Sequence, residues 1–181
     1  MLDFDEINAL VQVAFNDPDE DMTEVVTDIL INAFLEGIRA VEDMLDYSLD
    51  MGNDLTSMRN ILYTKIDGKT FEDRVKEYTE SGDLEAIKTV AETESHRVFE
   101  ASAYGTAKAI EIDSGRKVGK KWNTRQDGLV RETHVYLEGD VVGLDEKFFT
   151  YDGDSAYYAG GFEKAENNCG CRCNITYVFT P

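Results

Sequence analysis

The sequence predicts an α+β fold in which an acidic N-terminal helical arm is followed by a long helix and a small mixed β region. Apolar residues recur at helical spacing through most of the chain up to Ser114, which is typical of amphipathic helices. After Gly115, glycine, aromatic and β-branched residues become frequent and the patterns shorten, which favours short strands. The acidic residues gather near the N-terminus. We therefore divide the chain into an acidic helical arm, residues 1–54, and a second domain, residues 55–181.

The charge of the arm restricts the partners that it can bind. The chain has 37 Asp and Glu residues against 18 Lys and Arg residues, a net charge of −19. Residues 1–54 hold fifteen of these acids and one basic residue, Arg39, so the arm alone has a charge of −14. Like charge repels DNA and anionic membranes. We therefore expect at most weak contact with nucleic acid, and a solvated surface, docking onto a basic protein, or self-association of the arm.

No membrane segment or secretion signal is expected. The chain has no run of about 18 apolar residues, which a membrane-spanning helix requires. The first residues are acidic, whereas the start of a signal peptide is basic. These features predict synthesis in a cytoplasm.

The arm is expected to form two helices. Asn16-Asp17-Pro18 ends the first. The second begins there, with Asp17 as the N-cap, Pro18 in the first turn and Glu20 at the capping-box position, and Gly52-Asn53-Asp54 ends it. Neither helix is stable alone, so each must pack on the rest of the chain or on another subunit. Their apolar stripes are Ile7, Leu10, Val11, Ala14 and Phe15, and then Val26, Leu30, Phe34, Ile38, Val41 and Leu45.

The second domain is expected to contain one long helix and several short elements. The long helix begins at Asp83 and runs to about Ser114. Short helices are expected at 70–80 and 127–138, and strands near 117–123, 141–150 and 173–179. The stripe of the long helix is Leu84, Ile87, Ala91, Glu94, Val98, Ala101, Gly105 and Ile112.

Glu94 is the charged member of this apolar stripe. An unpaired carboxylate there would cost several kcal/mol, so we expect a buried or half-buried ion pair with an Arg or Lys from the second half of the chain. The alternative is a catalytic acid or base, because burial raises the pKa of a carboxyl group. We favour the structural interpretation.

A basic segment surrounds Trp122, the only tryptophan. A local basic island could contact phosphate, or it could pair with the acidic arm of the same or a neighbouring molecule. We favour the pairing because the whole chain is so acidic. The basic residues are Arg116, Lys117, Lys120, Lys121, Arg125 and Arg131.

The segment from Asp127 to Gly139 is expected to be helical. Asp127 would cap it, Gly139 would follow its last turn, and Arg131 and His134 would share a face. A strand would place Arg131 and His134 on opposite faces. His134 is a candidate metal ligand, general base or hydrogen-bonded structural histidine.

The three cysteines, Cys169, Cys171 and Cys173, lie within five residues of one another. Such crowding suggests zinc, with His134 as the fourth ligand, although the C-x-C-x-C spacing is not the usual one. A disulfide or simply buried thiols remain open. No P-loop, G-x-S-x-G, H-E-x-x-H or dinucleotide-binding glycine pattern is present.

The order of these residues resembles the phage Mu protein F-like family of minor head proteins. That family has an arginine-threonine-glutamate helix, a lysine-tryptophan strand, an R-x-x-H element and a terminal C-R-C. This chain departs from it in having Glu92 where an arginine is usual, and in the additional Cys169. The matching residues are Glu94, Arg97, Lys121, Trp122, Asp127, Arg131, His134, Gly139, Phe148, Cys171, Arg172 and Cys173.

The resemblance implies a structural role inside the head of a tailed phage or prophage. Family members lie in the capsid near the portal and act in head assembly and in DNA packaging or ejection. The portal or another capsid protein would then be the partner, and the virion the final location. In this interpretation Glu94, Arg131 and His134 form a buried polar knot. The alternative is a nuclease or toxin-like enzyme that uses the same three residues for catalysis.

Overall fold

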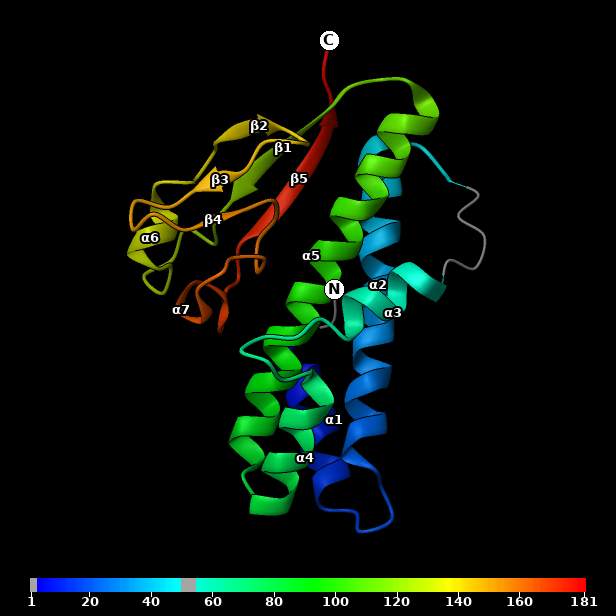
Figure 1. Ribbon diagram of the computed structural model, residues 1–181, viewed down its shortest axis with the longest axis vertical. Helices are drawn as coiled ribbons and strands as arrows, with labels where there is room; N and C mark the ends of the chain where they lie inside the picture. Colours follow the sequence, from blue (N-terminus) through cyan, green and yellow to red (C-terminus); the bar gives the residue numbers. More distant parts are fainter. Residues whose placement is uncertain (1–2, 50–54) are drawn as a thin grey trace.

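The computed structural model describes residues 3–49 and 55–181 and confirms the α+β class (Figure 1). Helices dominate the chain as far as Ser114, and the strands follow. The helices are α1 (Phe4–Phe15), α2 (Met22–Leu45), α3 (Leu55–Leu62), α4 (Phe71–Ser81), α5 (Leu84–Ser114), α6 (Glu132–Val135) and α7 (Ala165–Asn168). The strands are β1 (Val118–Asn123), β2 (Val141–Gly143), β3 (Phe148–Phe149), β4 (Ser155–Ala156) and β5 (Asn174–Phe179).

The two long helices, α2 and α5, lie side by side and form the axis of the molecule (Figure 1). Their closest approach is at Gly37, where an added Cβ would stand 2.0 Å from Ser102 Oγ and 2.3 Å from the Phe99 carbonyl oxygen. Ser102 Oγ donates a hydrogen bond of 2.9 Å to the Phe34 carbonyl. Only glycine lets the two backbones come this close.

A helical core surrounds the first halves of these two helices. Helices α1, α3 and α4 pack there, and Ile7, Val26, Phe71 and Ile87 are among its buried residues. The expected packing of the N-terminal helices on other parts of the chain is therefore confirmed. The boundary at residue 54 remains a prediction, since α2 contributes to both cores of the molecule.

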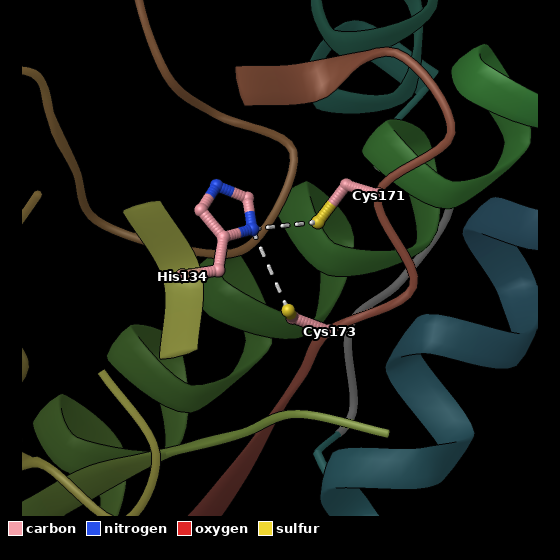
Figure 2. Close-up of side chains that lie close together, drawn as sticks. All are labelled: His134, Cys171 and Cys173. Atoms are coloured by element: carbon pink, nitrogen blue, oxygen red, sulfur yellow. Dashed lines mark hydrogen bonds between the residues drawn. The ribbon is translucent and has the colours of Figure 1, made fainter. Parts of the chain in front are cut away.

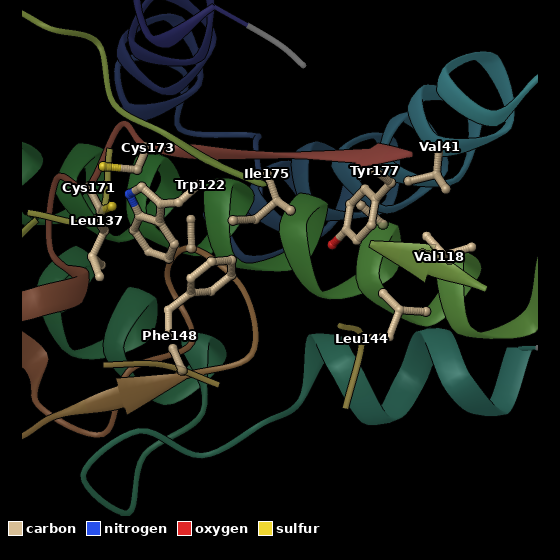
Figure 3. Packing of buried hydrophobic residues seen from close by; sticks show 14 of the residues in the cluster. Val41, Val118, Trp122, Leu137, Leu144, Phe148, Cys171, Cys173, Ile175 and Tyr177 are labelled. Carbon is tan, nitrogen blue, oxygen red and sulfur yellow. The ribbon is translucent and has the colours of Figure 1, made fainter. Parts of the chain in front are cut away.

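A second core lies between the other halves of α2 and α5 and a small sheet (Figure 3). The sheet has the order β2-β1-β5 with antiparallel neighbours, and Trp122 in β1 stands opposite Ile175 in β5. Trp122, Tyr177 and Phe148 are the largest apolar side chains buried in this second core. Strands β3 and β4 pair as a separate two-stranded ribbon. The expected strands at 117–123 and 173–179 are thus confirmed. The expected strand at 141–150 is instead β2 and β3, separated by a turn.

The buried face of α5 differs from the expected stripe near its C-terminal end. Gly105 and Ile112 are exposed, whereas Ala103, Ala107 and Ile110 are buried. This helix of 31 residues packs against other helices first and against the sheet later, so different faces are covered along its length. A single stripe cannot describe such a helix.

The start and end of α2 correct the sequence prediction. The N-cap is Asp21, which accepts a hydrogen bond from the Thr23 amide, and the segment from Asp17 to Glu20 is a turn. The helix ends at Leu45 because Asp46 adopts a left-handed conformation with φ 46°. The expected stop at 52–54 lies outside the described residues.

The expected helix at 127–138 is reduced to the single turn of α6. Arg131 is its N-cap position and makes no capping hydrogen bond there, and Tyr136 follows its last residue. Asp127 instead accepts hydrogen bonds from the Leu129 amide and the Arg172 side chain. Gly139 has φ +82° and its amide donates to the Trp122 carbonyl over 2.9 Å. Tertiary contacts therefore outweigh the local helical pattern.

Among the helices of the described residues, none is long and apolar enough to cross a membrane.

Replacing Gly37 by alanine should destabilise the protein by about 1–3 kcal/mol, because the new methyl group would force α2 and α5 apart. Gly105→Ala is the matched control. It lies on an exposed face of α5 with nothing within 4 Å of its added Cβ, so it should raise stability by up to about 1 kcal/mol. Urea unfolding of both variants measures the difference. Equal effects of the two substitutions would contradict the close packing at Gly37.

Candidate functional site

The first cluster of buried charges joins α4 and α5 around Glu94. Its carboxylate, which is fully buried, accepts hydrogen bonds of 2.8 Å from Arg74 Nη2 and 2.8 Å from Arg97 Nε. Arg97 also donates to the Ile61 carbonyl over 2.9 Å, so it connects α3 to α5. The expected ion pair of Glu94 is confirmed. One partner, Arg97, comes from the second half of the chain as expected, and the other, Arg74, comes from α4 in the first half.

The second cluster lies where α6 meets the start of β5. His134 Nδ1 is 3.7 Å from Cys171 Sγ and 3.6 Å from Cys173 Sγ (Figure 2). All three side chains are buried. Cys171 and Cys173 lie just before β5, and both sulfurs face the same imidazole. These three residues form the group that could hold a metal ion.

Cys169 is not part of this cluster, contrary to the sequence prediction. It is exposed, and it lies before the turn at Gly170. Its backbone carbonyl accepts a hydrogen bond from Arg131, so Arg131 supports the cysteine loop through the main chain. Arg172 points outward and pairs with Asp127 at 2.8 Å. The loop is therefore held from two sides by arginines.

Glu94, Arg131 and His134 do not form the single polar knot that the resemblance implied. Glu94 bonds to two arginines, Arg131 to a backbone carbonyl, and His134 faces two thiols. These are separate interactions in different parts of the fold. The same separation removes the geometric support for a catalytic triad of these residues, because acid, base and substrate-binding groups must converge.

Aromatic side chains pack around His134. The imidazole stacks on Phe162 with ring centroids 5.1 Å apart, and Trp122 meets it edge-on at 5.6 Å. Trp122 also contacts Phe148 edge-on at 5.1 Å. In Figure 3 Trp122 lies beside both cysteines. Trp122 and Phe148, two of the residues on which the sequence resemblance rests, thus pack in the same aromatic cluster as His134.

The two thiols are electrostatically unequal. A hydrogen bond with Cys173 lowers the pKa of Cys171 well below its usual range, and His134 acts in the same direction. The same contact raises the pKa of Cys173, as does its burial. Cys171 is therefore the more acidic of the two thiols.

Two buried residues of α5, His96 and Glu100, complete this region, and sequence reasoning missed both. His96 Nε2 lies 2.7 Å from the Cys173 carbonyl oxygen. Burial raises the pKa of the Glu100 carboxyl well above its usual range, and neighbouring Cys171 acts in the same direction. The Ile175 backbone amide acts in the opposite direction, although no hydrogen bond of good geometry reaches the carboxyl oxygens within the described part of the chain. Two polar residues four apart on a helix are usually a solvated face, so the sequence gives no sign of their burial.

The loop before the cysteines is fixed by two further residues that the sequence analysis did not select. Asn168 donates to and accepts from the Phe162 main chain, at 2.7 and 3.0 Å. The buried Asp154 accepts hydrogen bonds from the Glu163 and Lys164 amides at 3.2 and 3.1 Å. The positions of Cys171 and Cys173 thus depend on a rigid loop.

The basic island finds partners in its own half of the molecule rather than in the N-terminal arm. Lys117 pairs with Glu111 at 3.0 Å, and the Arg116 guanidinium lies 3.4 Å above the Phe179 ring. Lys120 is fully buried and donates to the Leu144 and Tyr157 carbonyls at 3.1 and 2.8 Å. The expected pairing with the arm is therefore wrong for Lys117 and Lys120. Lys121 is exposed.

Fold and site together define an α+β protein in which buried polar residues join a long central helix to a small sheet. The chain belongs to the phage Mu protein F like family, whose model matches residues 60–176. The resemblance found in the sequence is thus confirmed.

Two curated relatives are similar to this chain. The minor head protein GP7 of Bacillus phage SPP1 is 31% identical over 97 residues, which are 52% of this chain and 30% of that protein. The NAD(+)–arginine ADP-ribosyltransferase EFV of Enterococcus faecalis is 31% identical over 155 residues, 82% of this chain and 30% of that protein. The chain thus spans less than a third of the length of either relative. No solved structure matches it significantly.

The buried Lys120 predicts a specific dependence of stability on pH. Burial lowers the pKa of Lys120 from 10.5 to about 8, partly opposed by Asp145 and Glu146. Between these two values the unfolded chain binds the proton and the folded protein does not, so stability should rise with pH in this range. The gain is at most about 3 kcal/mol.

Unfolding by urea at several pH values from 7 to 10, for the wild type and Lys120→Met, measures this effect. Other groups titrate in both proteins and cancel in the difference. The stability of the wild type relative to the variant should increase above about pH 8. A difference that is constant with pH would show that Lys120 keeps its ordinary pKa.

Proposed function

We propose that this chain is a minor head protein of a tailed phage or prophage, located in the head interior at the portal and acting in head assembly and DNA packaging or ejection. The observation that supports this proposal most is membership of the Mu F-like family over residues 60–176. The minor head protein of phage SPP1 is a second support. Glu94 forms buried ion pairs and His134 packs against Trp122, and such structural contacts agree with a scaffold role.

The N-terminal helices are the part that we propose for docking to the portal or another capsid protein. Glu24, Asp28 and Asp43 are exposed on α2 and directed away from its buried face. Residues 1–54 contain fifteen acids and one basic residue, so the preferred partner surface is basic protein rather than DNA. Host cytoplasm is then the place of synthesis and the virion the final location.

The enzymatic alternative is supported by the similarity to one enzyme, but the arrangement of the candidate catalytic residues does not support it. The ADP-ribosyltransferase of Enterococcus faecalis matches over 30% of its own length, which does not indicate which part of that protein acts on NAD. In this chain His134 faces buried thiols and Glu94 is paired with two arginines. We therefore propose the scaffold role over catalysis by these residues.

Purified particles of a phage that encodes this chain should contain it in intact heads at low copy number. Peptide mass spectrometry measures this as the number of copies of the chain relative to the number of copies of the portal protein. Particle-free lysate from the same culture is the control for contamination. If the chain is abundant in the lysate and absent from intact heads, the proposed role is wrong.

A pair of charge-matched variants tests the docking surface in the same particles. The triple variant Glu24→Gln, Asp28→Asn, Asp43→Asn should reduce the number of copies per head. The control triple variant Asp140→Asn, Glu163→Gln, Glu166→Gln changes the charge equally at exposed positions of the C-terminal half and should be incorporated normally. Equal incorporation of both variants would locate the docking surface elsewhere.

A further inference from the structure

We propose that His134, Cys171 and Cys173 bind one zinc ion, which fastens α6 to the start of β5. The three ligand atoms, one nitrogen and two sulfurs, lie within 4.8 Å of one another and converge on the same point (Figure 2). This set differs from the one expected from sequence, since the exposed Cys169 is excluded. The inference does not depend on the role of the chain in a phage head.

The distances between the ligand atoms match a tetrahedral zinc site. Zinc lies about 2.3 Å from a thiolate sulfur and about 2.0 Å from an imidazole nitrogen. The edge between such a sulfur and nitrogen in a tetrahedron is then roughly 3.6 Å. The observed distances from His134 Nδ1 are 3.7 Å to Cys171 Sγ and 3.6 Å to Cys173 Sγ. Both nitrogen–sulfur distances therefore already fit a tetrahedral zinc site.

A small crevice beside the cluster supplies the fourth position. It has a volume of about 10 Å³ and is lined by His134, Cys173 and the surface residues Arg125, Arg131 and Arg172. This is the space of a single water molecule. Arg131 and Arg172 are engaged with the Cys169 carbonyl and Asp127, so their side chains frame the crevice without entering the ligand set. A water molecule is the natural fourth ligand, and the crevice is the route by which the metal enters.

The charge of the surroundings fits a neutral metal complex. Two thiolates cancel the charge of Zn²⁺, and a neutral complex is the least costly species in a site enclosed by Trp122, Phe148 and Phe162. The arginines at the crevice favour loss of the thiol protons on metal binding. Cysteine binds zinc as the thiolate, so the thiol protons leave when the ion binds.

A disulfide between Cys171 and Cys173 is the competing use of the same sulfur atoms. Both sulfurs are directed at His134 Nδ1 rather than only at each other, and the imidazole is held in this direction by stacking on Phe162. A disulfide would leave this nitrogen without a partner among the described residues. Metal ligation would satisfy Nδ1, which is favourable because a buried polar atom without a partner costs free energy. The other ring nitrogen, Nε2, is buried without a partner among the described residues in either case.

The test uses the full chain without a polyhistidine tag, purified in a reducing buffer from cells grown with added zinc. Mass spectrometry of the metals should find about one zinc ion per chain. The variants Cys171→Ser and Cys173→Ser should lose at least about nine-tenths of it. Cys169→Ser makes the same chemical change outside the cluster and should retain the full amount.

Two measurements keep the result decisive where a variant fails to fold. Wild-type protein freed of zinc and titrated with Co²⁺ should give the intense visible bands of tetrahedral cobalt and the thiolate charge-transfer band. Chelation should also lower the melting temperature of the wild type and of Cys169→Ser equally. Wild-type protein with reduced thiols, no bound zinc and no cobalt bands would overturn the proposal. Recovery of a Cys171–Cys173 disulfide from reducing buffer would do so as well.

Discussion

The middle of α5 has almost no face toward solvent, and the rest of the structure depends on this constraint. Thr93, Glu94, Ser95, His96 and Arg97 are each at most 9% exposed. A buried polar group without a partner costs free energy comparable to a lost hydrogen bond. Glu94, His96 and Arg97 are satisfied by elements that pack against the helix, and these contacts determine where those elements lie. Ser95 bonds to the Glu92 carbonyl of α5 itself, and the Thr93 hydroxyl has no partner among the described residues.

The polar residues of α5 bind both the other helices and the sheet. Glu94 and Arg97 bind α4 and the end of α3, while Ser102 bonds to α2 at the close contact of Gly37. On another face, His96 meets the Cys173 carbonyl at the entrance to β5. Helix α5 thus connects a core made of helices with a core that contains the sheet. Cys171 and Cys173 lie where the sheet meets α5.

The helices and strands that are determined by neighbouring residues in the sequence could be predicted from the sequence alone. The long helix was predictable because Asp83 caps its start, accepting a hydrogen bond from the Ala86 amide, and Gly115 ends it with φ +66°. Strands β1 and β5 followed from their β-branched and aromatic residues. The need for an ion pair at Glu94 followed from its place in an apolar stripe.

The features that could not be predicted depend on contacts between residues that lie far apart in the sequence. A partner of Glu94 was expected from the second half of the chain, but the fold also brings Arg74 of α4 to it, while Arg172 pairs with Asp127. His96 and Glu100 have the spacing of a solvated helical face, although both are buried. The segment 127–138 has a helical pattern, but the contact of Asp127 with Arg172 and of Gly139 with Trp122 holds most of it as a loop.

Native-state hydrogen exchange measures most directly whether α5 unites the two cores. The account predicts that the amides in the middle of α5 and those of β5 are the slowest to exchange, and that both exchange at the rate of global unfolding. Exchange of β1 and β5 through a separate opening, while α2 and α5 stay protected, would contradict it. The sheet would then be a separate unit that rests on the helices, and the buried contacts at His96 would not hold the protein together.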